Sequence, residues 1–173
     1  MSGPNSSAIP IVVMGVSGSG KTHIGKDIAR RWRYVFIEAD DLHSARAIEK
    51  MASGHPLGDD DRLPWLRRVG ERIREEVELG RPNVTACSAL KRAYRDLLRE
   101  YAPDAFFLLL DGPIEVVRPH VETRQHSFMP ASLLESQYET LETLESDESG
   151  IAVDLSLKPK VIARTLAAAL EKS

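Results

Sequence analysis

The sequence GVSGSGKT at residues 15–22 decides the fold of this chain. A short run of apolar, largely β-branched residues precedes it at 9–14, and a stretch with Ile24 and Ile28 at helical spacing follows it at 22–31. This order of strand, glycine-rich loop and helix is the context in which G-x4-G-K-[ST] forms a phosphate-binding P-loop. We therefore predict a site for a nucleotide phosphate at this loop.

Each residue type in the loop suits phosphate binding. Glycines permit the tight turn that points successive backbone N–H groups at phosphate oxygens, and the following helix adds the positive end of its dipole. Lys21 is predicted to reach the β- and γ-phosphates, and the hydroxyl of Thr22 to ligate Mg²⁺. A Gly/Ser turn beside a surface lysine is the alternative, but it would match the motif and both flanks only by coincidence. The residues predicted to bind ATP are Gly15, Val16, Ser17, Gly18, Ser19, Gly20, Lys21 and Thr22.

Composition and charge are those of an ordinary globular domain. The chain has 173 residues, of which 42% are hydrophobic and 28% charged, and its net charge of −3 gives no support to nucleic-acid binding. A single cysteine excludes an internal disulfide and fits a reducing compartment, and no apolar run is long enough to span a membrane. Residues 1–8 lack the features of a signal peptide. We expect them to be a disordered tail before a single cytoplasmic domain at 9–173.

Apolar strand-like runs alternate with helical patterns along the whole sequence. Strands are predicted at 9–14, 34–37, 83–87, 105–110 and 151–154, a loop at 54–62, and helices at 22–31, 44–52, 64–79, 91–101, 114–123, 131–141 and 159–171. This alternation is typical of βαβ units on a parallel sheet. We therefore predict an α/β chain with the three-layer fold of P-loop NTP hydrolases: a five-stranded parallel sheet, helices on both faces and a short lid at about 124–137. Ligands should bind at the carboxyl ends of the strands.

The P-loop alone does not separate kinases from other nucleotide-binding proteins. The chain lacks the N-K-x-D element with which GTPases read guanine, so we favour a kinase of a small metabolite. Such an enzyme needs a carboxylate that orients or deprotonates the acceptor hydroxyl. Asp40 follows the second predicted strand, which we expect to lie beside the P-loop strand, and its carboxylate is predicted to reach the γ-phosphate region. Asp41 should point the other way.

Several longer segments of the sequence resemble those of the small P-loop gluconokinases, a family related to shikimate kinase. The matching segments are GVSGSGKT at 15–22, ADDLH at 39–43, IEKMASGHPLGDDDRLPWL at 48–66, CSALKRAYRDLLR at 87–99 and SQYETLE at 136–142. They follow the order and spacing of the family over most of the chain. The resemblance implies an enzyme that transfers the γ-phosphoryl of ATP to the 6-hydroxyl of D-gluconate, and a cytosolic homodimer.

Gluconate is a polyol with a carboxylate, so its site needs cations and polar side chains rather than an apolar pocket. The residues predicted to bind it are His43, Asp61, Arg62, Ser88, Lys91 and Arg95. Arginine can hold a carboxylate through two hydrogen bonds, and Lys91 and Arg95 share one face of a helix. A solvated basic face is the alternative for these two, and it is the one that we prefer for Arg92. Three consecutive aspartates at 59–61 do not face one point, so we predict no metal cage there, and we expect Asp61 to turn into the site.

Arg124 is predicted to be the lid cation, which moves over the transferring phosphoryl and acts there with Asp40 and Lys21. The family has a His–Phe pair three residues after this arginine, whereas residues 124–129 read RQHSFM, with the histidine displaced by one position. Two other functions stay open on the sequence. One is a kinase of another small acceptor, such as shikimate or a nucleotide, and the other is a nucleotide-binding module that has lost transfer. Intact Lys21, Thr22 and Asp40 argue against the second.

Overall fold

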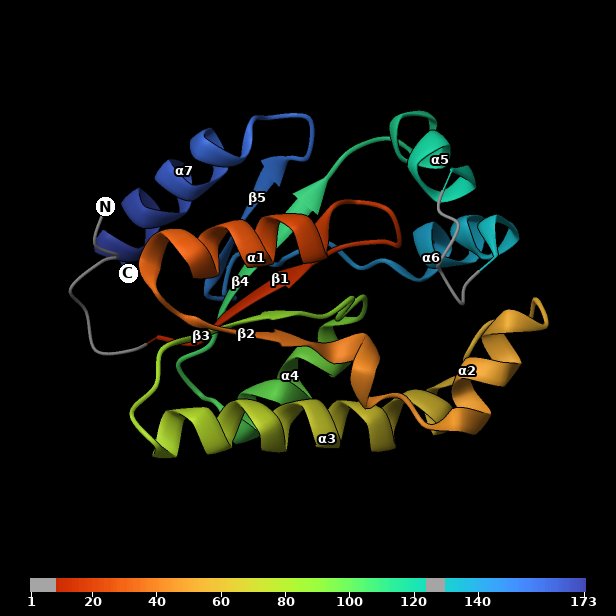
Figure 1. The fold of residues 1–173 in the computed structure, drawn as a ribbon, viewed down its shortest axis with the longest axis horizontal. Coiled ribbons are helices and arrows are strands. Elements are labelled where there is room, and N and C mark those ends of the chain that lie inside the picture. The colour runs from red at the N-terminus through yellow and green to blue at the C-terminus, as the bar shows by residue number, and fades with distance from the viewer. Residues whose placement is uncertain (1–8, 124–129) are drawn as a thin grey trace.

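The computed structural model describes residues 9–123 and 130–173, and these form one parallel sheet with helices on both faces (Figure 1). The strands are β1 (Ile11–Met14), β2 (Val35–Glu38), β3 (Asn83–Ala86), β4 (Phe106–Asp111) and β5 (Gly150–Asp154). They are all parallel, in the order β2-β3-β1-β4-β5. The predicted fold class is therefore confirmed.

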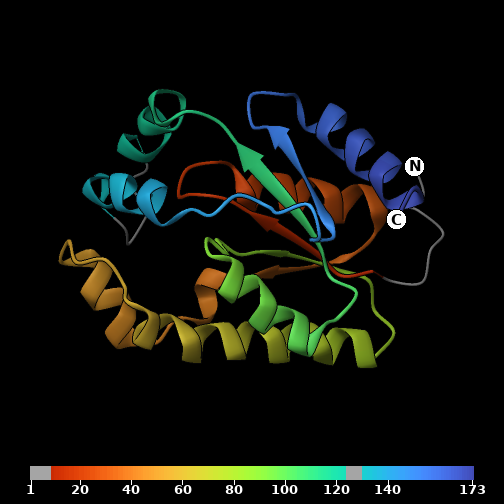
Figure 2. The same cartoon turned by 180° about the vertical axis from the view of Figure 1, so that it is seen from behind.

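The helices divide between the two faces of the sheet. They are α1 (Lys21–Trp32), α2 (Ala45–Ala52), α3 (Asp59–Glu78), α4 (Arg92–Tyr101), α5 (Ile114–Glu122), α6 (Leu134–Thr140) and α7 (Pro159–Glu171), with short 3₁₀ turns η1 (Ala39–Leu42) and η2 (Ala131–Leu133). Helices α3 and α4 cover one face, and α1 and α7 cover the other, as both views show (Figures 1 and 2). Among the described residues, no helix has the length and apolarity needed to cross a membrane.

The P-loop strand is the centre of the core. Because side chains alternate along a strand, Val12 and Met14 of β1 pack with α3 and α4, whereas Ile11 and Val13 pack with α1 and α7. All four side chains are fully buried. A strand that is apolar on both faces is expected in the middle of a parallel sheet. This burial fixes the end of β1, and with it the start of the glycine-rich loop.

Two local expectations differ from the structure. Strand β2 does not lie beside β1, because β3 pairs with both and separates them. Helix α3 begins at Asp59 rather than at Pro64. Acidic residues in the first turn interact favourably with the positive end of the helix dipole. In addition, the Asp61 carboxylate accepts a hydrogen bond from the N–H of Gly58 at 3.0 Å. Both effects extend the helix into the predicted loop.

The connections that follow β1, β2 and β3 meet at one edge of the sheet, because the strands are parallel. Beyond this edge lie α2 on one side and α5 and α6 on the other (Figure 1). The predicted lid at about 124–137 falls partly on residues 124–129, which lie outside the described residues, as does the tail at 1–8. Its described part consists of η2 and most of α6.

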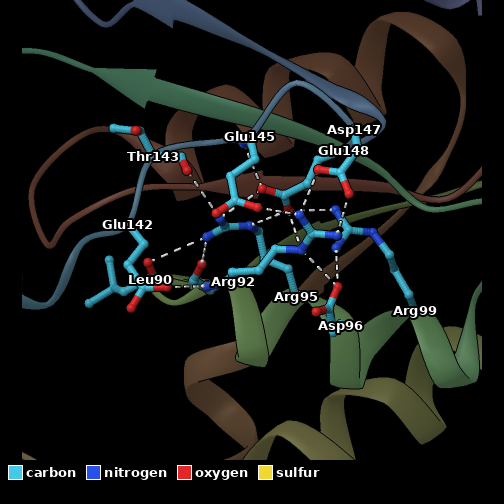
Figure 3. A network of polar contacts seen from close by, with 11 residues as sticks. Leu90, Arg92, Arg95, Asp96, Arg99, Glu142, Thr143, Glu145, Asp147 and Glu148 are labelled. Atoms are coloured by element: carbon cyan, nitrogen blue, oxygen red, sulfur yellow. Dashed lines mark hydrogen bonds and ion pairs between the residues drawn. The ribbon is translucent and has the colours of Figure 1, made fainter.

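A buried ion pair joins α4 to the segment that leads into β5 (Figure 3). The side chains of Arg95 and Glu148 are both 0% exposed, and the guanidinium donates two hydrogen bonds to the carboxylate, of 2.7 and 3.0 Å. Arg95 also donates to the carbonyl oxygen of Ala89 at 2.9 Å, and Arg99 donates to Glu148 at 2.7 Å. Burial alone would raise the pKa of Glu148, but these arginines and the N–H of Glu145 lower it to about 2. The network therefore fixes the loop after β3 against the segment before β5.

Replacing Glu148 with glutamine should lower stability and flatten its dependence on pH. The variant leaves the buried guanidinium of Arg95 without its counter-charge, which typically costs about 3–5 kcal/mol. The folded-state pKa of Glu148 lies below its usual value of 4.5, so the wild type keeps this stabilisation above that pH and loses it as the pH falls toward 2. Urea denaturation from neutral pH down to about pH 3 should show a gap between the two proteins that narrows in acid.

Glu145→Gln is the matched control, because Glu145 forms an ion pair with Arg92 but is 63% exposed. Its loss should cost less than about 1 kcal/mol. If Glu148→Gln were as stable as the control, or if the gap did not change with pH, the buried pair would not have the role described here.

Candidate active site

The loop between β1 and α1 has the backbone of a phosphate cradle. Gly15, Gly18 and Gly20 have positive φ angles of 146°, 78° and 100°, which other residues adopt only with strain. Space is tight as well, since a Cβ on Gly18 would lie 2.5 Å from Val121 Cγ2 in α5, and one on Gly15 would lie 2.8 Å from Ser19 Oγ. The first two positions therefore require glycine for both reasons.

A pocket lies over this loop, at the carboxyl edge of the sheet. Its lining residues are Ser17, Gly18, Gly20, Lys21, Thr22, Asp40, His43, Met51, Pro56, Leu57, Arg62, Trp65, Ser88, Leu133, Ser136 and Gln137. The P-loop contributes one wall. The predicted catalytic residue Asp40 and the predicted acceptor-binding residues His43, Arg62 and Ser88 contribute others. The pocket thus brings together side chains from the ends of three strands.

The two P-loop residues with chemical roles are held by hydrogen bonds. Lys21 donates from Nζ to the carbonyl oxygen of Val16 at 2.8 Å. The hydroxyl of Thr22 donates to a carboxylate oxygen of Glu38, which is the last residue of β2. The ammonium group therefore lies across the loop that should receive the phosphates, and the Thr22 oxygen lies beside a carboxylate.

These oxygens fit a hard cation. Mg²⁺ prefers oxygen ligands and usually keeps several waters and substrate phosphates in its shell. The Thr22 hydroxyl and the adjoining Glu38 carboxylate provide such ligands at the phosphate loop. No cluster of three or more His, Cys, Asp or Glu side chains that could hold a metal occurs among the described residues. The ion would therefore depend on the nucleotide as well as on Thr22.

Trp65 positions the acid and the histidine of the site. Its indole N–H donates to the carbonyl oxygen of Ala39 at 2.7 Å, which fixes the turn that carries Asp40. Its ring stacks on His43 with 4.1 Å between centroids and 13° between planes. In turn, Nε2 of His43 lies 3.8 Å from Oδ1 of Asp40. A buried aromatic side chain from α3 thus holds both polar groups in place.

The imidazole of His43 is neutral near pH 7. Burial lowers the pKa of His43 to about 4, and the attraction of Asp40 opposes this shift only in part. A neutral imidazole has one N–H donor and one acceptor nitrogen. His43 can therefore accept or donate a hydrogen bond to an acceptor hydroxyl, but it adds no positive charge.

Arg62 is the cation of the acceptor side of the pocket. It donates from Nη1 to the hydroxyl of Tyr94 at 3.2 Å and lies 5.6 Å from the centre of that ring. Among the described residues, no carboxylate lies within ion-pair distance of Arg62. Its charge is therefore available to an anionic ligand in the pocket.

Three predicted acceptor residues do not line the pocket. Arg95 is fully buried and is bound by Glu148, because the segment before β5 covers the face of α4 that we expected to meet the ligand. Asp61 is turned away by its contacts with the Lys50 ammonium at 2.7 Å and with Gly58. Lys91 pairs with Asp59 at 3.2 Å beside the pocket. Arg124 lies outside the described residues.

The prediction that Arg92 is a surface residue agrees with the structure. Arg92 is held on the surface by the exposed carboxylates of Glu145 and Asp147. The sequence analysis did not identify the wall formed by Leu133, Ser136 and Gln137, which comes from η2 and α6. The predicted lid at about 124–137 and the family segment SQYETLE at 136–142 cover these residues, but neither gave them a role in the site. Gln137 contacts the loop directly, since its Oε1 accepts a hydrogen bond from the N–H of Ser17 at 2.7 Å.

Known proteins resemble this chain over most of its length. Residues 11–144 match the protein family described as AAA domain. The thermosensitive gluconokinase of Escherichia coli strain K12 is 45% identical over 140 residues, which cover 81% of this chain and 75% of that protein. The crystal structure of a gluconokinase from Sinorhizobium meliloti 1021 is 46% identical, with a TM-score of 0.84, and covers 96% of this chain and 93% of its own. An unliganded sugar kinase from Janibacter sp. HTCC2649 has a TM-score of 0.89 at 48% identity and covers 95% of both chains. With this identity and coverage, the chain belongs to the gluconokinase family.

Proposed function

We propose that this protein transfers the γ-phosphoryl group of ATP to the 6-hydroxyl of D-gluconate by direct in-line displacement. The observation that supports this most is the pocket that joins the P-loop residues Lys21 and Thr22 to Asp40, His43 and Arg62. A phosphate cradle, a carboxylate and an arginine on the acceptor side are the parts that such a transfer needs. The family membership adds the identity of the acceptor.

In this proposal, Asp40 accepts a hydrogen bond from the acceptor hydroxyl and takes its proton as the new P–O bond forms. Lys21 turns from the Val16 carbonyl to the β- and γ-phosphates and compensates their charge. Thr22 is the protein residue that would hold Mg²⁺, which when bound neutralises charge on the phosphates. Arg124 remains the predicted lid cation.

The acceptor is held by complementary polar groups. The guanidinium of Arg62 binds the gluconate carboxylate, while neutral His43 and the Ser88 hydroxyl bind its hydroxyl groups. Met51, Leu57 and similar side chains in the lining exclude water around these contacts. The homodimeric state and the cytoplasmic location that the family resemblance implies stay predictions.

Gluconate should stimulate ADP release by the purified protein more than related acceptors do. The measurement is a coupled assay of ADP release with ATP, Mg²⁺ and a panel of sugar acids, neutral sugars, shikimate and nucleoside monophosphates. A site with a cation at the carboxylate rejects neutral sugars. If shikimate or a nucleotide stimulated turnover and gluconate did not, the acceptor would be wrong, while nucleotide binding without any turnover would remove the kinase assignment.

Asp40→Asn should reduce kcat by about 10²–10⁴ with little change in nucleotide affinity, because the amide cannot take the proton. Steady-state kinetics and calorimetry with an ATP analogue would measure the two effects. Asp41→Asn is the matched control: the adjacent carboxylate is exposed and does not line the pocket, so its kcat should stay near that of the wild type. Equal effects of the two substitutions would exclude Asp40 from the reaction.

A further inference from the structure

Gln137 reaches the phosphate loop from a distant part of the chain. Its Oε1 accepts a hydrogen bond from the backbone N–H of Ser17 at 2.7 Å, across 120 positions of sequence. Both residues line the pocket that also contains Lys21 and Asp40. A backbone N–H in a P-loop is normally a donor for phosphate oxygens. Here a neutral carboxamide occupies one such donor within the transfer pocket.

The position of Gln137 is fixed by its own helix. Leu134, one turn earlier in α6, is fully buried and packs with Val16 of the loop and with Val117 and Val121 of α5. Tyr138, the next residue, donates from its hydroxyl to the carbonyl oxygen of Gly112 at 2.8 Å. Contacts on both sides therefore hold this turn of α6 over the loop, and the carboxamide does not reach it by chance.

A hydrogen bond to Ser17 through Oε1 also orients the rest of the carboxamide. The group is planar, so Nε2 lies next to Oε1 and carries two N–H donors. The Gln137 side chain lines the same pocket as Lys21, Thr22 and Asp40, through which the phosphoryl group would pass from nucleotide to acceptor. Negative charge is spread over the equatorial oxygens of that group during transfer.

We propose that Gln137 is a catalytic residue that binds the transferring phosphoryl group. Its Oε1 stays on the N–H of Ser17, and its Nε2 donates a hydrogen bond to an equatorial oxygen of the phosphoryl. Gln137 exchanges no proton and forms no covalent bond. It acts as a preorganised dipole whose donor faces the developing charge. This inference rests on the proposed phosphoryl transfer and adds a residue to it.

The competing explanation is that Gln137 only ties α6 to the loop. Gln137→Glu separates the two, because a carboxylate has the same shape and still accepts from the N–H of Ser17, but has no donor for the phosphoryl. Gln137→Met removes both functions at similar length. Glu139→Gln, at an exposed position of the same helix, is the control and should behave like the wild type.

The experiment measures kcat and KM for ATP and gluconate, and binding of ADP and of a non-hydrolysable ATP analogue by calorimetry. We expect both Gln137 variants to lose about 10²–10³ in kcat, as when one oxyanion donor is removed, while KM for gluconate changes little. We expect Gln137→Glu to bind ADP normally but the ATP analogue more weakly, since its carboxylate would face the γ-phosphate.

Three results would overturn the proposal: normal kcat in Gln137→Glu, a rise in KM for gluconate at unchanged kcat, or equal weakening of ADP and the ATP analogue. Each would assign Gln137 to holding the loop or the acceptor instead. If Gln137→Met failed to fold, Gln137→Glu alone would decide. Absence of acceptor-stimulated turnover in the wild type would instead refute the proposed function itself.

Discussion

The rest of the structure depends on a glycine-rich loop that is held from several sides at once. The N–H of Gly15 donates to the carbonyl oxygen of Ser88 after β3, and the Cα of Gly18 lies against Val121 of α5. Ser17 donates to Gln137 of α6. Glycine permits the positive φ angles of this loop, and at Gly15 and Gly18 the neighbouring atoms also leave no room for a side chain. The acceptor side and the lid side of the pocket are therefore positioned through the same loop.

Local patterns in the sequence were sufficient for the fold class. Alternating strand and helix signals each depend on a few adjacent residues, and β1, β4 and α7 occur close to where these signals predict them. The position of β2 was wrong because the side on which a crossover places a strand is not a local property. The same limit applies to Arg95, whose partner Glu148 is far away in sequence. A basic helix face gives no sign of the segment that will cover it.

Part of the site was predictable for a similar reason. Carboxyl ends of parallel strands converge, so polar residues that follow them, such as Asp40 and Ser88, were expected in one pocket, and both line it. Gln137 was missed because no short-range pattern shows that α6 returns to the P-loop. A signal was present, since Leu134 and Leu141 lie one turn before and after it on the same inward stripe. A polar residue within an apolar stripe needs a partner, and here that partner is a backbone N–H.

The cations of this protein differ in what compensates them, and this difference explains how a chain of net charge −3 can bind two anionic substrates. The charge of Arg95 is cancelled by a buried carboxylate, so Arg95 stabilises structure and attracts nothing else. Arg62 and Lys21 instead donate to neutral oxygens, the hydroxyl of Tyr94 and the carbonyl of Val16. Among the described residues Arg62 forms no ion pair, so its guanidinium remains attractive to a carboxylate, and Lys21 lies across the loop that should receive the phosphates. Affinity for anions then depends on which cations keep their field, and the total charge of the chain has little influence on it.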